Sequence, residues 1–127
     1  MKTLLLVLTI IISEIIMAQN YDFEQHLYQS YDRYKESSLT HKRFKHSDIL
    51  PLINKLKSKD GFKVKVVGKS VEGRELNLIT IGKGKIKVYM WSQMHGDEPT
   101  ATAALFDIFN FINAPENKDF CDALFER

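Results

Sequence analysis

The chain has 127 residues and a formal net charge of +2; hydrophobic residues make up 44% of it and charged residues 27%. This balance is typical of one small globular domain and excludes an intrinsically disordered chain. The densest basic run covers only residues 41–46. It is too short for a nucleic-acid-binding surface, so we expect no nucleic-acid partner.

The first residues carry the pattern of a secretory signal peptide. A lysine at the second position precedes an apolar run over residues 4–12, and the small residue Ala18 offers a cleavage point that would leave a mature chain starting near Gln19. The alternative is an uncleaved membrane anchor, but a spanning helix needs about 20 mostly apolar residues and Glu14 interrupts the stretch. We therefore expect residues 1–18 to be removed, leaving a secreted or periplasmic protein without a stable membrane span.

The chain has one cysteine, Cys121, so it cannot form an intrachain disulfide. Cys121 lies beside Phe120 and Leu124 in an apolar-periodic segment. Nothing near it in the sequence would stabilise a thiolate. We expect a buried structural thiol and not a nucleophile.

Residues 19–47 form an aromatic-rich lead-in that precedes the first clear helix. This helix is predicted to begin at Asp48, which can act as its cap, and to end at Asp60-Gly61. Pro51 is expected in its first turn, where a missing backbone N–H is tolerated. Apolar residues three and four positions apart define one buried face: Ile49, Leu52, Ile53 and Leu56.

Three strands are predicted next, because the apolar period changes. They cover residues 62–66, 76–81 and 86–91, and glycine-containing turns separate them at 68–73 and 82–84.

A strong helical pattern follows over residues 99–112. Pro99 suits its first position, residues 113–115 stop it, and a second helical pattern runs over 119–127. The first of these helices is apolar over so much of its surface that we expect it to be buried against a sheet. Strands followed by a helix on the same body indicate an α/β fold.

His95 and Glu98 form an H-x-x-E pair between the third predicted strand and this helix. An imidazole nitrogen and a carboxylate oxygen at this spacing can reach one zinc ion when the turn bends between them, and Gly96 would permit that bend. The alternative is structural: Asp97 and Glu98 suit the positive end of a helix, and His95 is then merely polar. Sites in α/β sheets form at the carboxyl ends of strands, which favours the metal interpretation.

Two segments resemble the zinc carboxypeptidase family, that of the carboxypeptidase A-like enzymes: Val67–Leu76, which reads VGKSVEGREL, and Val88–Ala101, which reads VYMWSQMHGDEPTA. In that family a G-x-S-x-E-G-R-x-L hairpin leads into a strand, and a second strand ends at the H-x-x-E zinc ligands. The resemblance implies a three-layer α/β/α fold with a mixed central sheet, and Zn²⁺ as the cofactor. It makes His95 and Glu98 two zinc ligands, and it gives Glu72-Gly73-Arg74 a structural role.

The chain departs from the family pattern at two points. The residue before the ligand glutamate is often a substrate-contacting arginine in the family, whereas here it is Asp97, so strict recognition of a free C-terminal carboxylate is not expected.

The second departure concerns the family's third ligand, a histidine, and its catalytic arginine and glutamate, all of which lie well downstream of the H-x-x-E pair. No residue after Glu98 fits these roles: Glu116, Glu126 and Arg127 lie near the end, and the remaining histidines precede the pair, namely His26, His41 and His46. We expect residues 48–127 to be the N-terminal part of a truncated catalytic domain, with no catalytic residue in this chain.

The sequence thus predicts a zinc-dependent metallocarboxypeptidase-type hydrolase acting on a peptide or amide substrate, with this chain an inactive part of it. Two alternatives stay open: a deacylase-type zinc amidohydrolase, and a non-catalytic secreted domain that binds peptide. No pattern in the sequence sets the side-chain specificity or the oligomeric state.

Overall fold

The computed structural model describes residues 24–40 and 43–126. The chain forms two compact units, Met1–Lys35 and Glu36–Arg127. In the first, residues 24–34 are helical, and the buried hydroxyl of Ser30 donates a 2.7 Å hydrogen bond to the carbonyl of His26. The predicted signal peptide, residues 1–18, lies outside the described residues, and the predicted domain boundaries stay predictions.

The second unit begins its regular structure with helix α2, His46–Leu56. Asp48 caps it, as expected, but from inside the first turn, because its carboxylate accepts a 2.6 Å hydrogen bond from the backbone N–H of Lys45. The helix therefore starts earlier than predicted. The placement of Pro51 in the first turn was wrong: Pro51 lies one turn further in, where it has no N–H to donate to the carbonyl of Ser47.

A hairpin follows, made of β1, Phe62–Lys69, and β2, Glu75–Ile81. The strands are antiparallel, run in register from Phe62↔Ile81 to Lys69↔Glu75, and are interrupted by an irregularity between Val66 and Gly68. Both predicted strands are confirmed. In the connecting turn Gly73 has φ +76°, a conformation that disfavours other residues, and its N–H donates to the carbonyl of Ser70 at 2.9 Å. Arg74 forms an ion pair with Glu72.

The third predicted strand, residues 86–91, was wrong. This segment has no strand structure, and the sheet in the described part of the chain contains β1 and β2 alone. Its apolar side chains are exposed: Ile86 73%, Val88 79%, Tyr89 76%, Met90 58% and Trp91 65%. Alternating apolar and polar residues favour a strand, but a strand also needs a neighbouring strand that pairs with its backbone N–H and C=O groups.

The chain then enters α3, Thr100–Asn113, immediately after Pro99, and continues through a short 3₁₀ turn, Pro115–Asn117, into α4, Lys118–Phe125. Both helical predictions are confirmed. The first of these helices was expected to be buried against a sheet. Phe109 of α3 does contact Phe62 of β1, but the fully buried residues of α3 are limited to Thr102 and Phe106.

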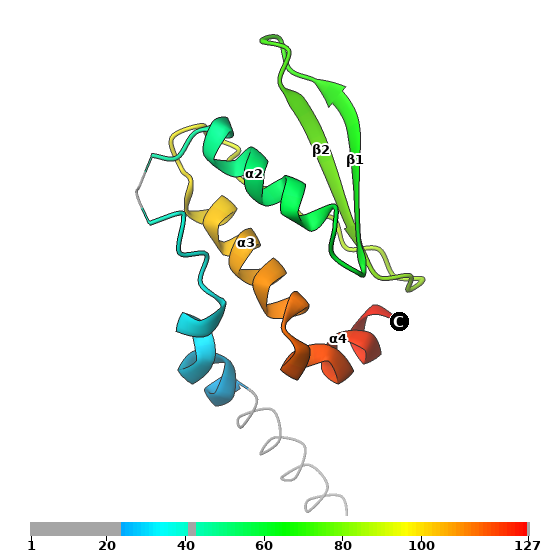
Figure 1. Cartoon of the computed structure of the whole chain (residues 1–127). Coiled ribbons are helices and arrows are strands. Elements are labelled where there is room, and N and C mark those ends of the chain that lie inside the picture. Colours follow the sequence, from blue (N-terminus) through cyan, green and yellow to red (C-terminus); the bar gives the residue numbers. More distant parts are fainter. Residues whose placement is uncertain (1–23, 41–42, 127) are drawn as a thin grey trace, which may run out of the picture. The chain divides into compact units, whose positions relative to one another are not determined.

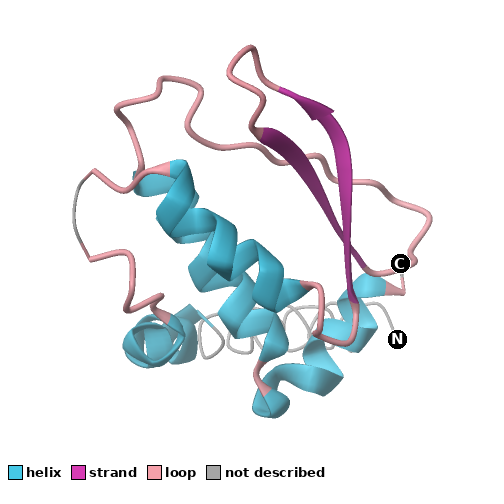
Figure 2. Ribbon diagram, turned by 45° about the horizontal axis from the view of Figure 1, so that its top comes forward, coloured by secondary structure: helices cyan, strands magenta, loops and turns pink. Residues whose placement is uncertain are grey.

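The hydrophobic core joins α2, β1 and α3, and Figures 1 and 2 show α2 and α3 running beside each other with the hairpin next to α2. Phe106 and Phe62 each meet Phe109 edge to face, with ring centroids 5.7 Å and 5.9 Å apart. Each fully buried apolar side chain contributes roughly 1.5–3 kcal/mol. The buried members of this core are Leu39, Phe44, Leu52, Leu56, Phe62 and Phe106.

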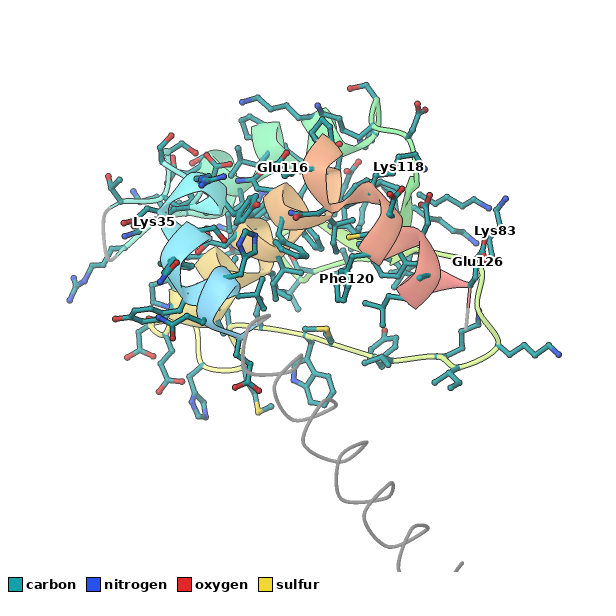
Figure 3. The ribbon with its side chains drawn as sticks, turned by 90° about the horizontal axis from the view of Figure 1, so that it is seen from below. Lys35, Lys83, Glu116, Lys118, Phe120 and Glu126 are labelled. Carbon is teal, nitrogen blue, oxygen red and sulfur yellow. The ribbon has the colours of Figure 1, made fainter. Side chains whose placement is uncertain are left out.

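The end of the hairpin is fastened to α4. The backbone N–H groups of Lys83 and Gly84 both donate to the carbonyl of Phe125, at 3.1 Å and 2.8 Å. Figure 3 shows Lys83 beside Glu126 at this junction, with Phe120 further back along α4. Cys121 on the same helix is only 4% exposed, which confirms the predicted burial.

Residues at the start of the second unit are fastened to α3. The N–H of Glu36 donates to the carboxylate of Asp107 at 2.7 Å. Its own carboxylate accepts hydrogen bonds from the hydroxyl and N–H of Ser38 and from the side-chain amide of Asn110. Burial raises the pKa of Glu36, but these hydrogen bonds and the charge of Lys55 outweigh it, so the pKa lies below its usual value.

The described part of the chain is therefore α/β, as predicted: helices packed with an antiparallel hairpin. In this part no helix combines the length and the apolar character that crossing a bilayer requires.

Candidate metal centre

The predicted metal pair lies on the irregular segment between β2 and α3. His95 and Glu98 are joined by a backbone hydrogen bond of 3.1 Å from the N–H of Glu98 to the carbonyl of His95. Their side chains meet as well: His95 Nδ1 lies 3.0 Å from Glu98 Oε2. Both side chains are 69% exposed, so an ion in solution can reach them.

This geometry fits a zinc site. Two ligand atoms that are each about 2.0–2.1 Å from a tetrahedral zinc ion lie roughly 3.3 Å apart, close to the separation of His95 Nδ1 and Glu98 Oε2. Imidazole nitrogen and carboxylate oxygen are both ligand types that zinc accepts. The separation of these two atoms is therefore compatible with two adjacent positions of a zinc coordination sphere.

The bend that brings the two side chains together does not depend on Gly96, contrary to the prediction. Gly96 does not have a positive φ, and a Cβ placed on it would meet no atom within 4 Å. Instead Gln93 has φ +56°, a left-handed conformation that costs a non-glycine residue about 1–3 kcal/mol. The backbone strain in this segment thus lies at Gln93, two residues before His95.

Hydrogen bonds hold Gln93 in that conformation. Its side-chain Nε2 donates to the carbonyl of Gly96 at 2.8 Å, and its Oε1 accepts from the hydroxyl of Thr102 at 3.0 Å. Thr102 also contacts the hydroxyl of Ser92 at 2.8 Å. Gln93 and Thr102 were not expected from the sequence. The one signal in the sequence is a polar residue, Thr102, on the same helical face as Phe106.

An open pocket of about 430 Å³ adjoins the pair and shares Glu98 with it. Its wall combines apolar and polar side chains. The lining residues are Trp91, Ser92, Gln93, Met94, Glu98, Thr100 and Ala101.

The other histidines and acids do not complete the site within the described residues. No group of three or more His, Cys, Asp or Glu side chains that could hold a metal is found there. His46 lies at the start of α2 with a buried, unpaired Nε2. Glu116 lies in the 3₁₀ turn and Glu126 caps the end of α4, whereas His41 and Arg127 lie outside the described residues.

These features define a class: an α/β protein with a paired imidazole and carboxylate on the segment that leads into a helix. The family model for zinc carboxypeptidases matches residues 49–124, a range that contains the hairpin, the H-x-x-E pair and α3. The chain belongs to the zinc carboxypeptidase family. Comparisons with curated proteins and with solved structures gave no significant match.

Membership places the chain among zinc-dependent hydrolases and metalloproteases at the level of the family, with Zn²⁺ as the cofactor and peptides as the class of substrate. The resemblance found in the sequence is thereby confirmed.

Proposed function

We propose that His95 and Glu98 are two protein ligands of a catalytic zinc ion in a metallocarboxypeptidase-type peptide hydrolase. The observation that carries this proposal is the 3.0 Å separation of His95 Nδ1 and Glu98 Oε2 inside the segment that matches the family. When bound, zinc would lower the pKa of a water molecule and polarise the carbonyl of the bond to be cleaved.

The residues of the chain have distinct tasks in this proposal. His95 offers the lone pair of Nδ1 when its proton is on Nε2, and Glu98 offers Oε2 as an anionic ligand. A catalytic zinc normally has three protein ligands and an open position, so a third ligand must come from another part of the protein. The pair alone should bind zinc weakly, and we expect the 127-residue chain by itself to be inactive.

A deacylase-type amidohydrolase is the second candidate, and Asp97 is the observation that favours it. Asp97 is exposed between the two ligands. Its negative charge would repel the C-terminal carboxylate that a strict carboxypeptidase must hold. An acylated amine or an amide without that carboxylate avoids this repulsion.

Zinc affinity, measured by competition with a chelator in the intact protein, tests the ligand assignment. His95→Ala and Glu98→Ala should each reduce the affinity strongly and remove any turnover. His26→Ala and Glu24→Ala are the matched controls, because both residues are exposed on the helix over residues 24–34. Unchanged zinc affinity after the first two substitutions would refute the assignment.

Substrate choice separates the candidates. Matched peptides with a free or an amidated C-terminus, and an N-acyl amine, should be offered to the zinc-loaded protein. Preference for the free C-terminus supports the carboxypeptidase, and preference for either of the others supports the amidohydrolase. Tight, chelator-sensitive zinc binding by a protein that holds a third ligand, without turnover of any substrate, would favour a non-catalytic, peptide-binding domain.

We also infer that the protein is exported, from the signal-peptide pattern of residues 1–18. Mass spectrometry of the secreted or envelope fraction should find a mature N-terminus near Gln19. An intact chain starting at Met1 in the cytoplasm would contradict this inference.

A further inference from the structure

A chain of side-chain hydrogen bonds connects the segment that carries the metal pair to α3. Thr102 has one hydroxyl proton and donates it to Gln93 Oε1 at 3.0 Å, so the 2.8 Å contact with Ser92 must be a hydrogen bond donated by Ser92. Gln93 Nε2 in turn donates to the carbonyl of Gly96 at 2.8 Å. The direction of donation is therefore the same throughout, from Ser92 through Thr102 and Gln93 to Gly96.

This series of hydrogen bonds ends at a residue that lies between the two members of the metal pair. The carbonyl that accepts the last hydrogen bond belongs to Gly96, which lies between His95 and Glu98. We propose that Gln93 is a positioning residue for the metal pair, and that Thr102 is the anchor through which Gln93 acts. The proposal depends on the zinc-binding role proposed above for His95 and Glu98.

The pair needs such support because its own two hydrogen bonds, between the backbones and between the side chains of His95 and Glu98, lie at an exposed position. Both ligand side chains are 69% exposed, and exposed side chains lose rotamer freedom when they are fixed by a metal. Gly96 adds no packing, since no atom lies within 4 Å of the position of a Cβ. A turn that already has the right shape in the absence of zinc reduces the entropy lost on binding.

The anchor is firm because Thr102 lies on the buried face of α3. It is 8% exposed, and Phe106, one turn further along the same face, is 6% exposed and belongs to the hydrophobic core. If the side chain of Gln93 served only to hydrogen-bond within its own turn, to Gly96, it would need no partner on α3. The bond from Thr102 instead fixes the side-chain amide of Gln93 relative to the core.

Two substitutions test the proposal in the full-length protein. Gln93→Leu removes the donor to Gly96 at similar size, and Thr102→Val removes the hydroxyl at the same shape. Each should weaken zinc binding about tenfold, the lower end of the range for residues that orient metal ligands. Thr102→Ser keeps the hydroxyl and should bind zinc as the unsubstituted protein does. Gln25→Leu and Thr80→Val, at exposed positions, control for the chemical change itself.

Hydrogen exchange of the Glu98 amide, which donates to the carbonyl of His95, gives a second readout in the zinc-free protein. It should become faster in Gln93→Leu and Thr102→Val, and should not change in Thr102→Ser. Gln93→Leu lies outside α3, so it remains informative if Thr102→Val loosens the helix.

Unchanged zinc affinity in Gln93→Leu, or unchanged exchange of the Glu98 amide, would overturn the proposal. Loss of affinity in Thr102→Ser as large as in Thr102→Val would also overturn it, since the effect would then come from packing and not from the hydroxyl. If instead His95→Ala and Glu98→Ala leave zinc affinity unchanged, the proposed function fails, and this result is separate because the exchange of the Glu98 amide does not involve zinc.

Discussion

Gly82 lies directly against Phe125. A Cβ added to Gly82 would stand 2.7 Å from the Cβ of Phe125 and 3.1 Å from its carbonyl oxygen. The same carbonyl accepts the hydrogen bonds of Lys83 and Gly84, so the close approach is part of the junction between the hairpin and α4.

Gly82→Ala should therefore destabilise the protein more than an equivalent substitution elsewhere in the hairpin. Gly73 is the matched control: its φ of +76° is close to the +78° of Gly82, but a Cβ there meets nothing within 4 Å. Gly73→Ala should cost about 1–2 kcal/mol through the left-handed backbone alone. Gly82→Ala should cost roughly 1–3 kcal/mol more through the clash. Urea unfolding measures the loss of stability in both variants. Equal losses would show that Phe125 can move away from the added Cβ with no loss of free energy.

The free energy of unfolding should depend on pH through Glu36. The folded state lowers the pKa of Glu36 below its ordinary value of 4.5, so its contribution is fully present above that value and is lost as the pH falls through the lower, folded value. Glu36→Gln should reduce stability by about 1 kcal/mol at pH 7 and by less near pH 3. Glu75→Gln, at an exposed position in β2, is the control. A Glu36→Gln effect that stays constant from pH 7 to pH 3 would contradict this account.

Trp91 is the one tryptophan of the chain and is 65% exposed. Acrylamide should therefore quench its fluorescence nearly as strongly as that of a free indole, and the emission should be that of a solvated ring. The urea-unfolded chain supplies the reference. Weak quenching of the folded 127-residue chain would mean that another surface covers residues 86–91.

Cys121 should react slowly with thiol reagents in the folded protein. Burial and the neighbouring charge of Asp122 both raise the pKa of its thiol above the ordinary value of 9.0, so little thiolate is present at pH 8. The rate should rise sharply when urea unfolds the chain. Similar rates in the folded and unfolded states would show that the thiol is accessible.

Local patterns predicted the regular elements of the fold well. The alternation from Phe62 to Val66 matches β1, and the spacing of apolar residues from Ala101 to Ile112 matches α3. In both elements the period of the apolar residues is the one that places them on a single face. Residues 86–91 show the same kind of alternation but form no strand, since strand formation depends on a partner that periodicity does not supply.

The candidate site, like the fold, was predicted only in part from the sequence. His95 and Glu98 could be identified because the motif fixes their spacing, and the structure brings their side chains together. Gln93 and Thr102 could not, because their hydrogen bond crosses from a loop to a helix and depends on how that helix is placed. The prediction for Gly96 was wrong for a related reason. A glycine in a motif predicts a bend at that position, but the left-handed residue of this segment is Gln93.

The short separation of His95 and Glu98 along the chain has a consequence for the order in which the site is assembled. Closing a loop costs more conformational entropy as the loop lengthens, by about 0.6 kcal/mol for each doubling. The two proposed ligands are three residues apart, so their meeting costs little and needs no distant part of the fold. Under the proposed function, the pair can form by itself, and the ion becomes tightly held only when folding brings a more distant ligand to it.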